Sequence, residues 1–362
     1  MTTRRAFLAT LAAATALPRM AWADLGSPAY LAAGKAGDAF LLHGLTATGD
    51  SLFRITLPAR GHAAAAHPSQ ALAVAFARRP GTFALVIDCA TGLTRHQLTP
   101  PPGRQFNGHG SFSRDGDLLM TSEVVAEGSA GRIGLWETAG FTRIGEWDSH
   151  GTGPHDMKRL EDGRLIIANG GIQTDPSDRT KLNLPTMRPN LTLLAADGTL
   201  LDQADLPDLY QNSIRHLALT ATGVAFAMQW QGDPAEAVPL LGLWSPGSPI
   251  KLCPPAEGDA LTMQGYAGSI AVDPSDGIIA MTSAPGGVVM LFDADGTPLT
   301  TLHRADISGA AASPTGLGPT GFVATDGQGA IWSLTRAGLT LLNQHTTLWD
   351  NHLVAIGPVT HT

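Results

Sequence analysis

Residues 351–357 read NHLVAIG and residues 215–219 read RHLAL, so the chain ends on a motif that it also carries in its middle. Both segments have the length and the apolar character typical of a β-strand. Strand-like segments that align with these two recur at intervals of about 40 to 60 residues, a period typical of β-propellers. The aligned segments begin near His62, His109, His155, His216, Ser269, Gly309 and His352.

Turn signals divide each repeat into strands. Asp-Gly or Thr-Gly pairs occur at residues 115–116, 162–163, 222–223, 276–277 and 326–327, and a second set of glycine turns falls between them. Two hairpins in each repeat correspond to one four-stranded blade, so seven repeats predict an all-β fold, a seven-bladed β-propeller. Six or eight blades remain alternatives, because residues 172–189 form a proline-containing insert and the first blade is short.

The last repeat has room for a single strand. A ring of blades must protect the edges of its sheets, and one way is to complete a blade with strands from both ends of the chain. We therefore expect the C-terminal strand, residues 352–357, to become the innermost strand of the first blade. Its outer strands would come from residues 27–61.

Five of the seven aligned segments carry a histidine at or next to the same position. The chain has only 12 histidines in 362 residues, so this enrichment is unlike a random distribution. The innermost strands of a propeller surround its central channel, and equivalent positions converge on the channel mouth. The sequence therefore predicts a ring made of His62, His109, His155, His216 and His352. The alternative is a water-filled channel lined by polar residues of mixed type.

A cluster of neutral imidazoles suits a transition metal ion. Histidine is a common ligand of iron, copper and zinc, and the absence of Cys and Met from the motif disfavours a thioether copper(I) site. Metal-bound histidines usually need a partner that fixes their tautomer, and Asp156 is a candidate for that role. Arg215 and Gln229 lie near the predicted mouth and are candidates for holding a cofactor or orienting a substrate. Arg215 has a second interpretation, hydrogen bonding to carbonyls of a neighbouring blade.

The N-terminus has the features of a twin-arginine signal peptide. Arg4-Arg5-Ala6-Phe7-Leu8 precedes an apolar run over residues 9–17, and Ala21-Trp22-Ala23 is a typical cleavage site. The run is too short to span a bilayer, which disfavours an anchor. We expect residues 1–23 to be removed, residues 24–362 to form a single propeller domain, and the mature protein to act in the periplasm.

Charge and cysteine content narrow the partners. Removing residues 1–23 takes away three arginines and no acid, so 20 basic and 31 acidic residues remain and the net charge is −11. This balance disfavours nucleic acid or an anionic membrane surface as partner, and we expect a monomer. Cys89 and Cys253 lie in separate strand-like segments and are expected to be isolated buried thiols.

The leader together with the motifs at Arg60-Gly61-His62, Asn107-Gly108-His109-Gly110, Gly153-Pro154-His155-Asp156, Ser213-Ile214-Arg215-His216 and Asn351-His352 resembles the family called domain of unknown function 1513. The resemblance runs over nearly the whole chain. It implies a periplasmic propeller encoded beside imelysin-like iron-uptake proteins and a di-haem oxidoreductase-like protein. Such proteins are the partners expected for this chain. The family has no assigned reaction, so it supplies no catalytic residues.

These observations leave three functions in competition. The first is a periplasmic metal-binding propeller, with iron favoured over copper, that acts in metal uptake or redox handling. The second is a metal-dependent oxidoreductase centred on the histidine ring. The third is a metal-free scaffold for protein interactions, as many propellers are.

Overall fold

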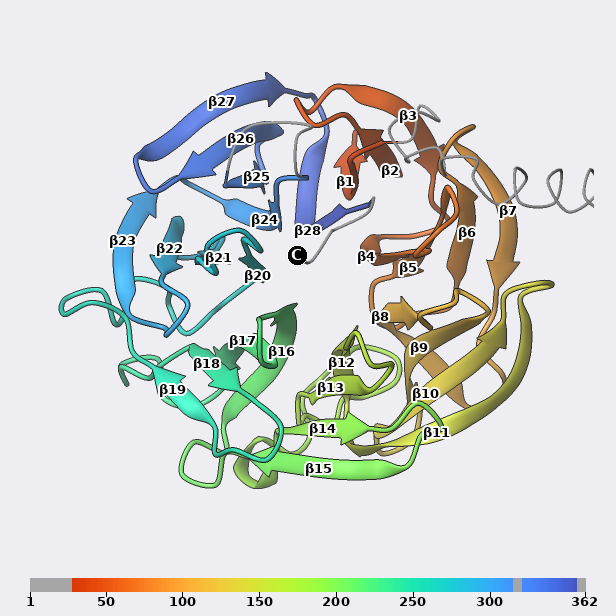
Figure 1. Ribbon diagram of the computed structural model, residues 1–362, viewed down its shortest axis with the longest axis horizontal. Coiled ribbons are helices and arrows are strands. Elements are labelled where there is room, and N and C mark those ends of the chain that lie inside the picture. Colours follow the sequence, from red (N-terminus) through yellow and green to blue (C-terminus); the bar gives the residue numbers. More distant parts are fainter. Residues whose placement is uncertain (1–27, 315–320, 357–362) are drawn as a thin grey trace, which may run out of the picture.

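The computed structural model describes residues 28–314 and 321–356. These residues form seven four-stranded antiparallel sheets arranged as blades around a central axis (Figure 1). The seven-bladed, all-β prediction is confirmed. The twin-arginine segment lies outside the described residues.

The innermost strand of every blade contains the position that the repeat predicted. The first blade consists of β28 (Leu348–Ala355), β1 (Tyr30–Ala36), β2 (Ala39–Leu45) and β3 (Ser51–Thr56). The second and third consist of β4 (Gly61–Ala66), β5 (Leu72–Ala77), β6 (Ala84–Asp88) and β7 (Leu93–Leu98), then β8 (Arg104–Phe112), β9 (Leu118–Val125), β10 (Ala130–Glu137) and β11 (Thr142–Thr152). The fourth consists of β12 (Pro154–Arg159), β13 (Leu165–Asn169), β14 (Asn190–Leu194) and β15 (Leu200–Asp205).

The remaining three blades follow the same order from the axis outward. They consist of β16 (Asn212–Leu219), β17 (Val224–Trp230), β18 (Leu241–Trp244) and β19 (Lys251–Cys253), then β20 (Ser269–Val272), β21 (Ile279–Ser283), β22 (Val288–Phe292) and β23 (Pro298–His303), then β24 (Ile307–Ala312), β25 (Phe322–Asp326), β26 (Ala330–Thr335) and β27 (Gly338–Gln344). Four of the five Asp-Gly and Thr-Gly turns follow an innermost strand as expected. The fifth, at residues 326–327, instead joins the second and third strands of its blade.

The C-terminal strand closes the ring as predicted. β28 pairs antiparallel with β1, with Tyr30 opposite Ala355 and Lys35 opposite Leu348. Trp349 and Leu353 are buried between this blade and the last one. The two ends of the chain therefore share one sheet, and no innermost strand is missing from the described ring.

The hydrophobic core is divided among the gaps between blades. Each of the seven clusters in the described part of the chain joins residues from two neighbouring sheets. One cluster, for example, packs Leu31 and Leu42 of the first blade against Ala75 and Leu85 of the second. The alternation of strand residues places one apolar face toward each neighbour, so the blades support one another and leave the axis to other side chains.

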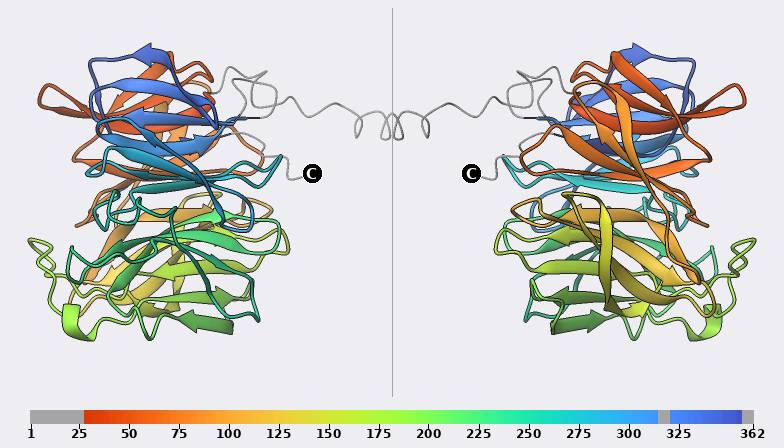
Figure 2. Two further views of the ribbon diagram at one scale, coloured as in Figure 1. Left: turned by 90° about the vertical axis from the view of Figure 1, so that its left-hand side faces the viewer. Right: turned by 90° about the vertical axis from the view of Figure 1, so that its right-hand side faces the viewer.

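One connection departs from the short turns of the rest of the ring. Between β13 and β14 the chain forms an insert over residues 170–189 that contains the short 3₁₀ helix η2 (Leu184–Thr186). Figure 2 shows this green segment projecting from one face of the ring. Cys89 and Cys253 are free and buried, as expected. Among the described residues, no helix has the length and hydrophobicity needed to cross a membrane.

Candidate metal centre

A β-bulge lies at or beside each histidine of the ring. In the innermost strands the pairing register shifts at the same level of the channel, which leaves residues there outside the regular ladder. The shifts occur between Gly61 and Ala64, Phe106 and Gly110, Pro154 and Met157, and Ile214 and His216, and opposite His352. A bulge bends the strand and redirects side chains, and here it accompanies imidazoles that meet at the axis.

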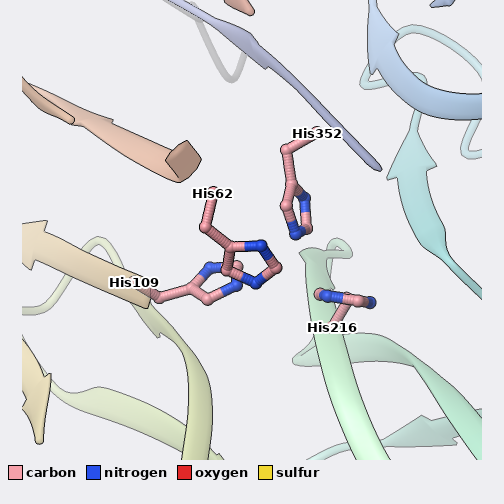
Figure 3. Close-up of side chains that lie close together, drawn as sticks. All are labelled: His62, His109, His216 and His352. Carbon is pink, nitrogen blue, oxygen red and sulfur yellow. The ribbon is translucent and has the colours of Figure 1, made fainter. Parts of the chain in front are cut away.

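Four of the five imidazoles converge on one point. His62, His109, His216 and His352 come from four different blades, and each offers a ring nitrogen that lies within 4.8 Å of the others. Figure 3 shows these four rings facing one another. Two nitrogens that bind the same ion at about 2.0 to 2.1 Å lie at most about 4.2 Å apart. Only a small approach of the widest pair would therefore let all four nitrogens bind one ion.

The fifth histidine supports the cluster from behind. His155 Nε2 lies 3.0 Å from His216 Nε2, so a proton on one of these atoms is shared between the two rings. When His216 donates that proton, its Nδ1 keeps a lone pair, and this Nδ1 has no other hydrogen-bond partner. The geometry thus separates His155, which orients a neighbour, from the four histidines that face the common point.

Asp156 fixes the tautomer of His109. Its carboxylate lies 3.2 Å from His109 Nδ1 and accepts hydrogen bonds from the backbone N–H groups of Met157 and Leu217. Burial raises the pKa of Asp156, but the charge of nearby Lys158 and the contact with His109 outweigh that effect and lower it overall. An ionised Asp156 holds the proton on Nδ1 and leaves His109 Nε2 free to accept a metal ion.

The buried rings are neutral and incompletely hydrogen-bonded. Burial is the main cause that lowers the pKa of His62, His155, His216 and His352 well below 6.5, and the neighbouring imidazoles lower it further. Each ring of the five has one buried nitrogen without a hydrogen-bond partner among the described residues. Buried polar atoms without partners are uncommon in folded proteins, and a metal ion would satisfy several of these at once.

Close packing explains why the cluster occupies one side of the channel. A Cβ atom at Gly309 would lie 2.8 Å from the backbone nitrogen of Leu353, so the seventh blade has no room for a histidine there. Gly108 has a φ of +98°, and a Cβ at this residue would lie 2.3 Å from the ring of His62. Glycine at position 108 therefore allows the His62 ring to reach the axis.

The remaining histidines are not all surface residues. His43 was expected on the surface, but only 1% of it is exposed, and burial lowers its pKa to about 4. Its ring packs against Trp349 and donates or accepts hydrogen bonds with Ser51 and Thr347. The chain brings β28 over His43, and that contact between distant segments carries no local sequence signal.

The channel mouth contains the two polar residues expected there. Gln229 is half-buried at the end of β17, and its side-chain amide donates to the carbonyl of Ala267 at 3.2 Å. Arg215 is 5% exposed, and its Nε has no hydrogen-bond partner among the described residues. Neither residue faces the common point of the imidazoles within ligand distance. The described contacts of Arg215 thus give no support to the alternative in which it binds carbonyls of a neighbouring blade.

Basic side chains that the sequence analysis did not select surround Arg215. The positive charges of Arg78, Arg179 and Arg215 all act on Arg79, and those of Arg79 and Arg215 act on Lys181. A signal was present in the sequence, because Arg78-Arg79 directly follows the second strand of a blade. In an antiparallel blade that strand ends where the innermost strand begins, at the same mouth as the histidines.

Comparison with known families identifies the chain. A family model described as protein of unknown function (DUF1513) matches residues 55–356, which contain all five channel histidines. The chain belongs to the DUF1513 family. This confirms the family resemblance of the motifs. A search of curated proteins found no match for this DUF1513 protein.

Solved structures similar to this DUF1513 protein share its fold. A chain of "Kuenenia stuttgartiensis Hydrazine Synthase" is 13% identical, with a TM-score of 0.61 over 89% of this chain and 96% of that one. "Crystal structure of RRP9 WD40 repeats" is 13% identical, with a TM-score of 0.56 over 87% of this chain and 85% of that one. At these identities the similarity establishes the propeller architecture of the DUF1513 protein and nothing about its chemistry.

Proposed function

We propose that this DUF1513 protein is a periplasmic metal-binding propeller that acts in metal uptake or redox handling. The observation that carries the proposal is the convergence of His62, His109, His216 and His352 on one buried point from four blades. A rigid ring holds these side chains in place, while His155 and Asp156 orient two of them. Such an arrangement is typical of a preorganised metal site.

The donor set suits iron, copper and zinc, since all four groups are imidazoles. The preference for iron rests on the family resemblance, whose members are encoded beside imelysin-like iron-uptake proteins. We propose such periplasmic proteins as partners that deliver the ion or receive it. A metal-dependent oxidoreductase is the second candidate, and the buried Arg215 one residue from His216 favours it, because this cation could hold an anionic substrate beside the metal.

Titration of metal-free protein with Fe(II) under anaerobic conditions, Cu(II) and Zn(II) tests the proposal. We expect saturation at one ion per chain at pH 7.5. Copper should bind more tightly than iron at any nitrogen site, so the metal content of protein purified from the periplasm, not the order of affinities, identifies the natural ion. Failure of all three ions to give saturable binding would contradict a metal function.

The same titration should depend on pH in one direction. A proton competes with the ion for each ring nitrogen, so affinity falls as the solution becomes acidic. Because burial lowers the pKa of His62, His216 and His352 below 6.5, the loss should begin at a lower pH than for a site of exposed histidines. Calorimetry at pH 7.5, 6.5 and 5.5 measures this, and tighter binding at pH 5.5 would argue against imidazole ligands.

Export tests the proposed location. An Arg4→Lys, Arg5→Lys double variant is expected to accumulate as unprocessed precursor in the cytoplasm, because the twin-arginine pathway requires the arginine pair. Cell fractionation and N-terminal sequencing of the mature protein, which should begin at Asp24, provide the measurement. Processing of the double variant at the wild-type rate would rule out this route.

A further inference from the structure

The strongest feature that the metal proposal leaves unused is a group of basic side chains at the channel mouth. The mouth cluster is defined here as Arg78, Arg79, Arg179, Lys181 and Arg215. Its members come from three places that the fold brings together: the segment after β5, the insert between β13 and β14, and the innermost strand β16. The chain as a whole carries a net charge of −8, so this local excess of cations opposes the general balance.

Hydrogen bonds tie these segments to one end of the channel. The backbone N–H of Arg78 donates to the carbonyl of Arg60 at 2.8 Å, which places it beside the start of β4. In the insert, the carbonyl of Pro176 accepts a hydrogen bond from Gln105, and Lys181 Nζ donates to Gln231 at 2.5 Å. The insert therefore lies across the mouth, held by the third and fifth blades.

Arg215 is the buried member of the cluster. It is 5% exposed, and a Cβ at Gly170 would lie 3.4 Å from its Nη1, so the guanidinium sits against the base of the insert. Its Nε has no hydrogen-bond partner, and no carboxylate within the described part of the chain forms an ion pair with it. A buried charge without a partner is strongly unfavourable, which indicates that a partner is supplied from outside.

The neighbouring charges make the same point for Arg79. Burial lowers its pKa well below the usual value, and the charges of Arg215, Arg179 and Arg78 lower it further. Burial also lowers the pKa of Arg215, to about 10, while Tyr266 raises it and Arg179 lowers it. Like charges packed this closely repel one another unless an anion lies among them.

The acids near the mouth are already engaged. Asp350 accepts two hydrogen bonds from Arg60, at 2.5 and 3.0 Å, and has a third, longer contact with Arg78. Asp175 and Asp178 in the insert accept hydrogen bonds from the backbone of their own loop. Arg79 and Arg215 have no ion pair with a described carboxylate, so their two charges are left without compensation.

A neutral hydrogen-bond donor completes the site. The hydroxyl oxygen of Tyr266 accepts from Asn351 Nδ2 at 2.7 Å, which leaves the hydroxyl proton free to donate. Tyr266 lies next to Gln229 and close enough to Arg215 to affect its charge. Two guanidinium groups and a hydroxyl proton form the kind of donor set that binds carboxylate or phosphate oxygens.

We propose that the mouth cluster binds a small multivalent oxyanion, a polycarboxylate or a phosphate, between Arg79 and Arg215, with Arg179 and Lys181 at its rim. Two uncompensated guanidinium groups match at least two negative charges. Arg215 directly precedes His216, so the anion would lie beside the histidine cluster. The anion site depends on the protein's own charges and should exist without a metal ion.

Calorimetry on metal-free protein, prepared with a chelating resin, tests this inference with citrate, inorganic phosphate and acetate. We expect saturable binding of citrate or phosphate and at least about tenfold weaker binding of acetate. The citrate and phosphate arms distinguish a polycarboxylate from a phosphate ligand. An Arg79→Gln, Arg215→Gln variant should bind the preferred anion at least about tenfold more weakly. The matched control is Arg54→Gln, Arg336→Gln, which removes two exposed arginines elsewhere and should bind like wild type.

Two further readouts keep the outcome clear. If the Arg215 variant does not fold, the exposed rim variant Arg179→Gln, Lys181→Gln should fold and weaken binding by about threefold or more. Without anion, Arg79→Gln should melt at the same temperature as wild type or higher, because it removes repulsion. Absence of saturable binding for both multivalent anions, or equal binding by the double variant and its control, would overturn the inference. Neither outcome depends on whether the histidines bind metal.

Discussion

Deletion of residues 351–362 is expected to yield a chain that does not fold to a stable state. The deletion removes most of β28, the innermost strand of the first blade, and with it the pairing to β1. It leaves Tyr30, Leu31 and Ala32 with an unpaired strand edge and exposes the apolar gap to the last blade. An open ring with an unprotected edge is prone to aggregation. Circular dichroism and size-exclusion chromatography of the truncated protein measure the effect.

Two leucines of β28 provide a matched pair of point substitutions. Leu353 is 4% exposed, and Leu353→Ala should lower the free energy of unfolding by about 2 to 5 kcal/mol. Leu348 lies on the same strand but is 51% exposed, so Leu348→Ala should change it by less than about 0.5 kcal/mol. Equal melting temperatures for the truncated and full chains would disprove closure by the C-terminal strand.

Replacement of two ligand-facing histidines is expected to abolish tight metal binding and leave the propeller folded. In a His109→Ala, His352→Ala variant, two of the four converging nitrogens are lost and the affinity should fall at least about a hundredfold. The fold should persist, because backbone hydrogen bonds and the apolar gaps between blades hold the ring. Both rings also have a buried nitrogen without a partner, so removing them deletes no observed hydrogen bond at that atom.

The control variant is His96→Ala, His303→Ala, which removes two exposed histidines far from the channel and should bind metal like wild type. His155→Ala should weaken binding less than His216→Ala, because His155 contacts the cluster only through its neighbour. Metal titration and thermal melting are measured on all four variants. A folded His109→Ala, His352→Ala protein that binds an ion as tightly as wild type would refute the proposed ligands.

The repeat in the sequence was sufficient to predict the architecture. Turn spacing and the similarity of residues 351–357 to residues 215–219 predicted the number of blades and their closure, because each blade is a local unit with its own turns. The same alignment placed five histidines at one level of the channel. This succeeded because equivalent positions of a closed ring lie at equivalent distances from its axis, whatever the details of packing.

Only the tertiary structure decided how those histidines are used. Four rings face one point and His155 lies behind His216, a distinction that depends on the β-bulges and on the space left by Gly108. The burial of His43 and the assembly of Arg79 with Arg215 likewise join segments far apart in the chain. Sequence spacing determines the blade and level of a residue. The direction of its side chain and the charges around it depend on neighbours from other blades, and those neighbours are set by packing across the ring.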